Sequence, residues 1–122
     1  MAERITSFRD LKTWQEAQDL AVEIYKLSAT FPESEKFGLT NQMRRAGVSV
    51  GSNIAEGFSR QTAKEKSQYY YIAKGSLTEV ESQIDLAMRV GYLDAMLLEA
   101  LVLKIEQVGR LLTALIRNIP VR

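Results

Sequence analysis

Five basic side chains in the middle third of the chain could contact phosphate groups or an acidic partner. They are Arg44, Arg45, Arg60, Lys64 and Lys66. Residues 38–75 carry six basic and two acidic side chains, although the whole chain has a net charge of only +1. Lysine and arginine are the side chains with which proteins most often bind nucleic-acid phosphates. For the arginine pair, the alternative is a solvated helix face or an ion pair with Glu56.

The three cations between residues 60 and 66 surround the expected start of a helix. Positive charge is unfavourable there, because the helix macrodipole already makes its N-terminus positive. We therefore expect an anion or an acidic partner to compensate for Arg60, Lys64 and Lys66. Charge reversal at these positions should then reduce nucleic-acid binding more than charge reversal elsewhere.

Two polar residues, Asn53 and Glu56, stand beside apolar positions in the segment NIAEG. Polar groups at such places can fix the register of helix packing or of a subunit interface. A carboxylate is costly to bury without a partner. We expect Glu56 to lie at an edge or to pair with one of the cations Arg45, Arg60 and Lys64.

Three glycines, Gly47, Gly51 and Gly57, raise the question of a phosphate-binding loop. A Walker loop needs a lysine directly after its second glycine and a strand before the loop. This stretch has no such lysine, and the residues before it do not predict a strand. Instead, apolar residues recur at alternating steps of four and three over residues 39–57, which is typical of a helix. Gly47 and Gly51 would then share one face. We expect them to admit a bulky neighbour there, with these candidates: Trp14, Tyr25, Tyr69, Tyr70 and Tyr71.

The chain contains no histidine and no cysteine. Nucleophilic sites of the Ser-His-Asp and Cys-His types cannot be built without these residues, and neither can a thiolate or imidazole metal site. The remaining alternative is an enzyme with Mg²⁺ held by carboxylates alone, but no motif marks such a site. We expect no enzyme activity, no catalytic residue, no cofactor and no bound metal. The polar N-terminus does not resemble a signal peptide and no stretch is apolar enough to span a membrane, so we expect a cytoplasmic protein with no membrane contact.

The elements that would position these residues are four helices in one domain spanning residues 1–122. The apolar periodicity predicts helices over about 10–30, 39–58, 62–90 and 94–119. Thr62 and Asp94 are expected to cap the third and fourth helices, and Gly91 to end the third. Helices of this length joined by short connections predict an all-α fold, an antiparallel up-down-up-down four-helix bundle.

Several segments resemble a known family. RRAGVSVGSNIAEGFSR, followed by YYYIAKGSLTEVESQI, is similar to the bacterial four-helix-bundle proteins encoded by intervening sequences in 23S ribosomal RNA genes. The opening segment from residue 8 and MRVGYLD near residue 90 resemble that family too, so that the likeness extends to about residue 119. It implies a four-helix bundle that assembles into a ring, commonly a homopentamer. Accessory proteins of diversity-generating retroelements are similar in fold and assembly, and they bind nucleic acid and a reverse transcriptase.

The expected function is a non-catalytic homo-oligomeric scaffold or adaptor that binds RNA or DNA through a basic patch. Self-association is also suggested by small residues on the third helix and by a wide apolar surface on the fourth, which are Ala73, Gly75, Ser76, Leu97, Leu98, Val102 and Leu103. The alternative is a protein-binding module without nucleic-acid contact, a partner of a reverse transcriptase or of another neighbouring gene product.

Overall fold

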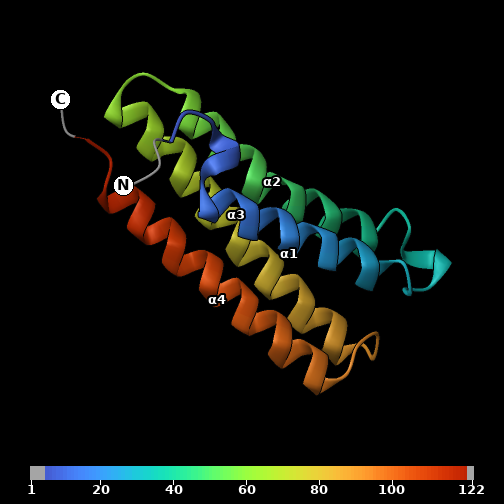
Figure 1. The fold of residues 1–122 in the computed structure, drawn as a ribbon. Helices are drawn as coiled ribbons and strands as arrows, with labels where there is room; N and C mark the ends of the chain where they lie inside the picture. The colour runs from blue at the N-terminus through green and yellow to red at the C-terminus, as the bar shows by residue number, and fades with distance from the viewer. Residues whose placement is uncertain (1–4, 121–122) are drawn as a thin grey trace.

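The computed structural model describes residues 5–120, which form four α-helices and two short 3₁₀ turns. Their bounds are η1 Phe8–Asp10, α1 Lys12–Ser28, η2 Glu33–Glu35, α2 Leu39–Ser59, α3 Ala63–Arg89 and α4 Ala95–Arg117. The helices run side by side with alternating direction, and the described chain begins and ends at the same end of the bundle (Figure 1). The predicted all-α antiparallel four-helix fold is confirmed.

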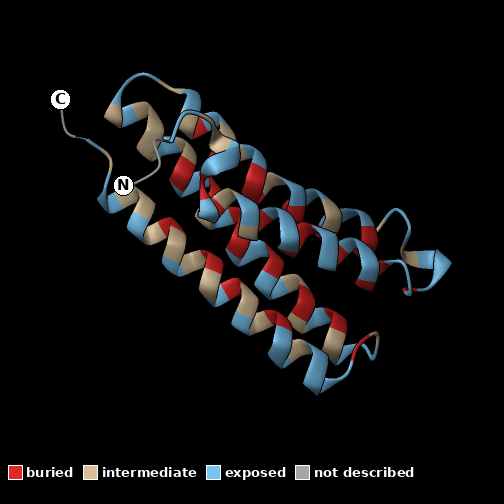
Figure 2. Cartoon of the chain, in the orientation of Figure 1, coloured by how far each residue is buried: buried red, intermediate tan, exposed pale blue. Residues whose placement is uncertain are grey.

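Each helix packs against the helices before and after it, and α1 also contacts α4. Contact is most extensive between α2 and α3 and least extensive where α4 meets its two neighbours. The side chains that face inward form a continuous apolar core along the bundle (Figure 2). The largest fully buried members come from all four helices: Leu20, Ile24, Met43, Val50, Ile54, Val80, Ile84, Val108 and Leu112. Burial of each contributes about 1.5–3 kcal/mol.

The glycine-bearing stretch is helical throughout and lies inside α2. A Cβ placed on Gly47 would lie 2.8 Å from Ile24 Cδ1, and one on Gly51 would lie 2.5 Å from Gln18 Oε1. Trp14 is a neighbour of Gly51, with Nε1 3.7 Å from the same added atom. The prediction of close packing is confirmed, but aliphatic and amide side chains of α1 supply most of the contact in place of the expected aromatic rings.

The first helix is shorter than predicted. Leu11 adopts extended backbone angles, φ −75° and ψ 123°, and so separates η1 from α1. Ser7 and Asp10 form a reciprocal capping box on η1, which stabilises that separate turn. At the other end α1 stops at Ser28, two residues before the predicted limit. Helix α4 likewise ends at Arg117, short of the predicted residue 119.

The predicted caps of the later helices are present. Thr62 Oγ1 accepts a hydrogen bond from Glu65 N at 3.1 Å, and Asp94 Oδ1 accepts one from Leu97 N at 2.8 Å. Gly91 ends α3 with a φ of 92°, in the left-handed region. Tyr92 N donates to Ala87 O at 2.9 Å, which is the long hydrogen bond of a Schellman motif.

A hydrogen bond joins the two connections at the end of the bundle away from the termini. Tyr92 Oη donates to Glu35 Oε2 at 2.7 Å, and Leu39 N donates to Glu35 Oε1 at 3.1 Å. Both bonds favour the ionised carboxylate and lower the pKa of Glu35, the tyrosine hydroxyl having the larger effect. Within residues 5–120, no helix is long and apolar enough to cross a membrane.

Candidate nucleic-acid interface

Arg44 is held against the end of α1. Its Nε donates to Ser28 Oγ at 2.8 Å, and its Nη2 donates to Tyr25 O at 3.3 Å. The guanidinium also lies over the Tyr25 ring, 4.6 Å from the centroid. The last carbonyl groups of a helix have no partner within the helix, so a cation there is favourable. Arg44 therefore joins α2 to α1 and is not a free cation.

Arg60 and Lys66 hold the turn between α2 and α3. Arg60 Nη2 donates to Tyr69 Oη at 2.8 Å and approaches Glu56 Oε2 at 3.4 Å. Lys66 Nζ donates to Phe58 O at 2.7 Å, so it neutralises the C-terminus of α2. The expected pairing of Glu56 with one of three cations is confirmed, with Arg60. Arg60 thus has an ion-pair partner in Glu56, and Lys66 has a carbonyl partner at the end of α2, so both already have partners within the chain.

Arg45 and Lys64 remain exposed, but they are far apart. Arg45 lies in the second turn of α2, and Lys64 lies at the start of α3, beyond the other end of α2. A rise of 1.5 Å per residue places roughly 20–25 Å of helix between them. The five predicted cations therefore do not form one patch.

Asn53 belongs to a polar cluster between α2 and α3. Its Nδ2 donates to Ser49 O at 2.8 Å and to Ser49 Oγ at 2.9 Å. Ser49 Oγ in turn shares a hydrogen bond with Ser76 Oγ at 2.8 Å. These bonds link specific turns of the two helices, which supports the predicted role of Asn53 in fixing helix register.

Gly57 faces the same α2–α3 contact nearer to the turn. A Cβ on Gly57 would lie 2.6 Å from Tyr70 Cε1 and 3.1 Å from Tyr69 Cβ. Tyr70 is buried, and this burial raises the pKa of its hydroxyl. Among Tyr69, Tyr70 and Tyr71, only Tyr71 is exposed, so the three rings do not form one surface on which nucleic-acid bases could stack.

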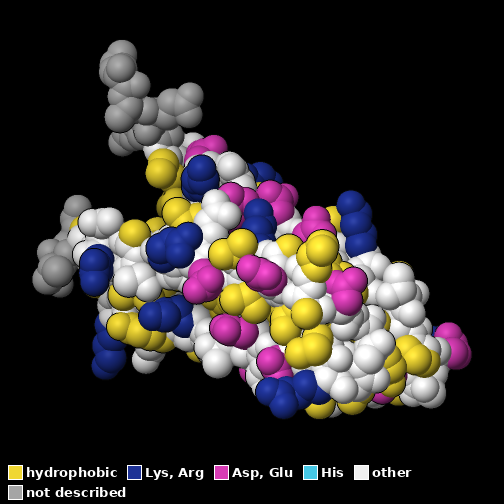
Figure 3. Space-filling view, turned by 90° about the horizontal axis from the view of Figure 1, so that it is seen from below, with side chains coloured by type: hydrophobic (Ala, Val, Ile, Leu, Met, Phe, Trp, Pro, Cys, Tyr) yellow, Lys and Arg dark blue, Asp and Glu magenta, His cyan; other side chains and the backbone are white. Residues whose placement is uncertain are grey.

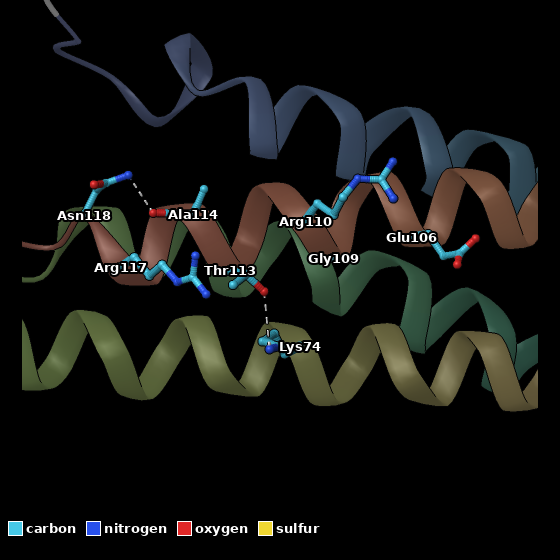
Figure 4. A pocket seen from close by; sticks show the side chains of 8 residues that line it. All are labelled: Lys74, Glu106, Gly109, Arg110, Thr113, Ala114, Arg117 and Asn118. Atoms are coloured by element: carbon cyan, nitrogen blue, oxygen red, sulfur yellow. Dashed lines mark hydrogen bonds between the residues drawn. The ribbon is translucent and has the colours of Figure 1, made fainter.

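A groove between α3 and α4 contains cations that the sequence predictions missed. It has a volume of about 710 Å³, and its charged lining residues are Lys74, Arg110, Arg117 and Glu106 (Figure 4). Arg110 and Arg117 are exposed and lie seven residues apart, which is two turns on one face of α4. This spacing of two arginines was visible in the sequence, but both residues lie outside the basic segment 38–75.

Between α1 and α4, one ion pair is partly buried. Lys104 Nζ and Gln107 Nε2 each donate to the Glu16 carboxylate at 2.8 Å. The hydrogen bond from Lys104 is the main cause of the lowered pKa of Glu16. Lys104 is therefore a structural cation that joins the two helices.

An apolar strip is exposed along α1 and the first half of α4. We define it by Val22, Met96, Leu97 and Leu103, of which Met96 is 81% exposed. The small-residue patch predicted on α3 is not a free surface, because Ala73 and Ser76 are buried against the rest of the bundle. Gly75 alone of that patch is exposed.

Charge is unevenly distributed along the bundle. The half nearer the termini, residues 5–20, 49–76 and 106–120, carries eight basic and six acidic side chains. The opposite half, residues 21–48 and 77–105, carries six basic and eight acidic side chains. On the face seen in Figure 3, lysine and arginine gather toward the end with the termini, and acidic side chains occupy the middle.

A family profile and a solved structure both match this chain. The profile of a family described as 23S rRNA-intervening sequence protein matches residues 9–114. A crystal structure from Bacteroides thetaiotaomicron VPI-5482, described as a protein with unknown function from the S23 ribosomal protein family, is 25% identical and has a TM-score of 0.77. That likeness covers 87% of this chain and 99% of the other chain. None of the curated proteins matches this chain.

Proposed function

We propose that this chain, which belongs to the 23S rRNA-intervening sequence protein family, is a non-catalytic, homo-oligomeric scaffold of the cytoplasm that binds RNA or DNA. The main support is the basic end of the bundle. Of the cations there, Lys12, Lys64, Lys74, Arg110 and Arg117 make no ion pair with any residue in the range 5–120. Unpaired surface cations are available to replace the counterions of a nucleic acid.

Self-association would strengthen binding that a single weakly charged chain provides poorly. The exposed side chains of the apolar strip, Val22, Met96, Leu97 and Leu103, support such an assembly, because large apolar side chains left in solvent often mark a protein interface. A closed ring, as the family resemblance implies, presents several basic ends together. Several weak contacts made at once bind a polymer much more tightly than one contact does.

Two measurements on the purified full chain test this function. Light scattering gives the mass of the assembly, and filter binding gives the affinity for RNA and for DNA at several salt concentrations. The proposal predicts an oligomer whose affinity falls steeply as salt rises. Failure to bind either nucleic acid at low salt would refute the binding part, and a monomer would refute the assembly part.

The apolar strip also favours a second function, that of a protein-binding module. A groove of about 540 Å³ lies beside the strip, and its apolar lining consists of Val22, Leu97, Ala100 and Leu101. Its other lining residues are charged, namely Asp19, Glu23, Lys26 and Lys104, so a partner helix that packs there would need both apolar and charged side chains. The partner would be a reverse transcriptase or another neighbouring gene product. Affinity purification after nuclease treatment separates the two functions, since only a protein partner survives digestion.

A further inference from the structure

The groove between α3 and α4 combines cations from two helices with small and neutral polar side chains. Its uncharged lining residues are Gly109, Thr113, Ala114 and Asn118. We propose that this groove is the site where the phosphate backbone of the bound nucleic acid lies. This inference rests on the proposed function and assigns it to one surface of the molecule.

The cations of the groove are positioned for more than one phosphate. Arg110 and Arg117 are separated by seven residues, or roughly 10 Å along the helix axis. Figure 4 shows the two guanidinium groups at separate positions along α4, that of Arg110 extending toward α1 and that of Arg117 lying on the side of α3, from which Lys74 comes. A row of separated cations matches a chain of phosphates better than a single phosphate ion.

These cations are free to bind an external anion. Lys74, Arg110 and Arg117 form no ion pair with residues 5–120, and the lining includes a single carboxylate, that of Glu106. Lys74 Nζ donates only a long hydrogen bond, 3.5 Å, to Thr113 Oγ1. The groove is therefore net positive, whereas Arg44, Arg60 and Lys66 already have partners within the chain.

Neutral groups in the groove suit the contacts that nucleic-acid backbones make. The Thr113 hydroxyl accepts from Lys74 and can still donate its own hydrogen to a phosphate oxygen. Ala114 lies between the two arginines on α4 and has only a methyl side chain, so the sugar and phosphate can approach the helix surface there. Such contacts are made to phosphate and sugar and do not distinguish base sequence. We therefore expect binding with little sequence preference.

The test compares two double variants of the full chain that remove the same charge. Arg110→Gln with Arg117→Gln removes the groove cations on α4. Lys26→Gln with Arg45→Gln removes two exposed cations from the opposite half of the bundle, which likewise make no ion pair with residues 5–120. Fluorescence anisotropy with a labelled single-stranded RNA and a labelled DNA duplex gives the affinity over a range of salt concentrations. Circular dichroism and light scattering show whether fold and assembly are kept.

The groove variant should bind about 100-fold more weakly, since each lost contact to a charged group is worth about tenfold. Its slope of log affinity against log salt should be shallower by about 1.4–1.8 for each subunit that contacts the nucleic acid, because each such subunit loses two phosphate contacts. The control variant should retain its slope. Lys74→Gln, on α3, should reduce the slope by about 0.7–0.9 for each such subunit and provides a separate test if the double variant does not fold.

The outcomes separate the two proposals. Equal weakening in the groove and control variants would show that binding follows net charge, and it would overturn the groove site while leaving the proposed function intact. An unchanged affinity in Lys74→Gln and in a folded groove variant would overturn the groove site as well. Absence of binding by the wild-type chain at low salt would refute both proposals together.

Discussion

Substitution of Gly57 by alanine tests the close packing of α2 against α3. The added methyl group would lie 2.6 and 2.8 Å from two carbon atoms of the Tyr70 ring, well inside van der Waals contact. Tyr70 is only 2% exposed, so its ring cannot swing into solvent. Overpacking of this kind costs about 1–3 kcal/mol. Because alanine is intrinsically better than glycine in a helix by up to about 1 kcal/mol, the net loss should be about 1–2 kcal/mol.

Gly75 provides a matched control in the neighbouring helix. Its position is exposed, and a Cβ there would meet nothing within 4 Å. Gly75→Ala should therefore stabilise the protein by about 0.5–1 kcal/mol, through helix propensity alone. Urea unfolding of both variants at one protein concentration measures their free energies of unfolding. Gly57→Ala should lie below the wild-type chain and Gly75→Ala above it, with roughly 2–3 kcal/mol between the two variants.

The other two glycines of α2 give a graded comparison. The atoms that crowd Gly47 and Gly51 are the ends of flexible side chains, Ile24 Cδ1 and Gln18 Oε1. Gln18 is exposed, so its amide can rotate away and alanine at Gly51 should cost less than alanine at Gly57. Ile24 is fully buried, so alanine at Gly47 should cost more than alanine at Gly51. Equal stability of Gly57→Ala and Gly75→Ala would refute the packing argument, as would a larger loss at Gly51 than at Gly57.

Three further predictions concern charge, acid sensitivity and assembly. Arg44→Gln should lower the free energy of unfolding by about 1–2 kcal/mol and leave RNA affinity per folded molecule unchanged; weaker binding at unchanged stability would contradict its structural role. The lowered pKa of Glu35 means that its stabilisation is full above the ordinary carboxyl pKa and is lost as pH falls through the lowered value. Tyr92→Phe should therefore reduce stability near neutral pH more than in acid, as urea unfolding at roughly pH 7 and pH 3 would show. An equal loss of stability at both pH values would contradict the claim that Tyr92 stabilises the ionised Glu35 carboxylate. Glutamate at Met96 and Leu103 should reduce the mass measured by light scattering while helicity is kept; an unchanged mass would show that the strip is not the subunit interface.

Most of the fold was predictable from the sequence because its helices have regular apolar spacing. The regular apolar spacing, together with the caps Thr62 and Asp94, placed every helix end to within two residues. The break at Leu11 was not predictable, because its cause is the competing capping box of Ser7 and Asp10 on a separate turn. Periodicity alone does not distinguish that turn from a helix start.

The candidate site was less predictable, because charge in the sequence does not show which cations are already paired. Arg44 and Lys66 looked like free surface charges, yet they satisfy carbonyl groups at the ends of α1 and α2. Such contacts join residues that only the folded arrangement brings together. Lys74 and Arg110 are distant in sequence, and they line one groove because α3 and α4 are adjacent.

Sedimentation velocity of a fluorescently labelled RNA with the wild-type chain tests most directly whether a multi-subunit particle carries the nucleic acid. At low salt, the labelled RNA should sediment as one fast species with the mass of several chains, and it should return to the rate of free RNA as salt rises. RNA that sediments alone at low salt, or together with a single chain, would contradict the account.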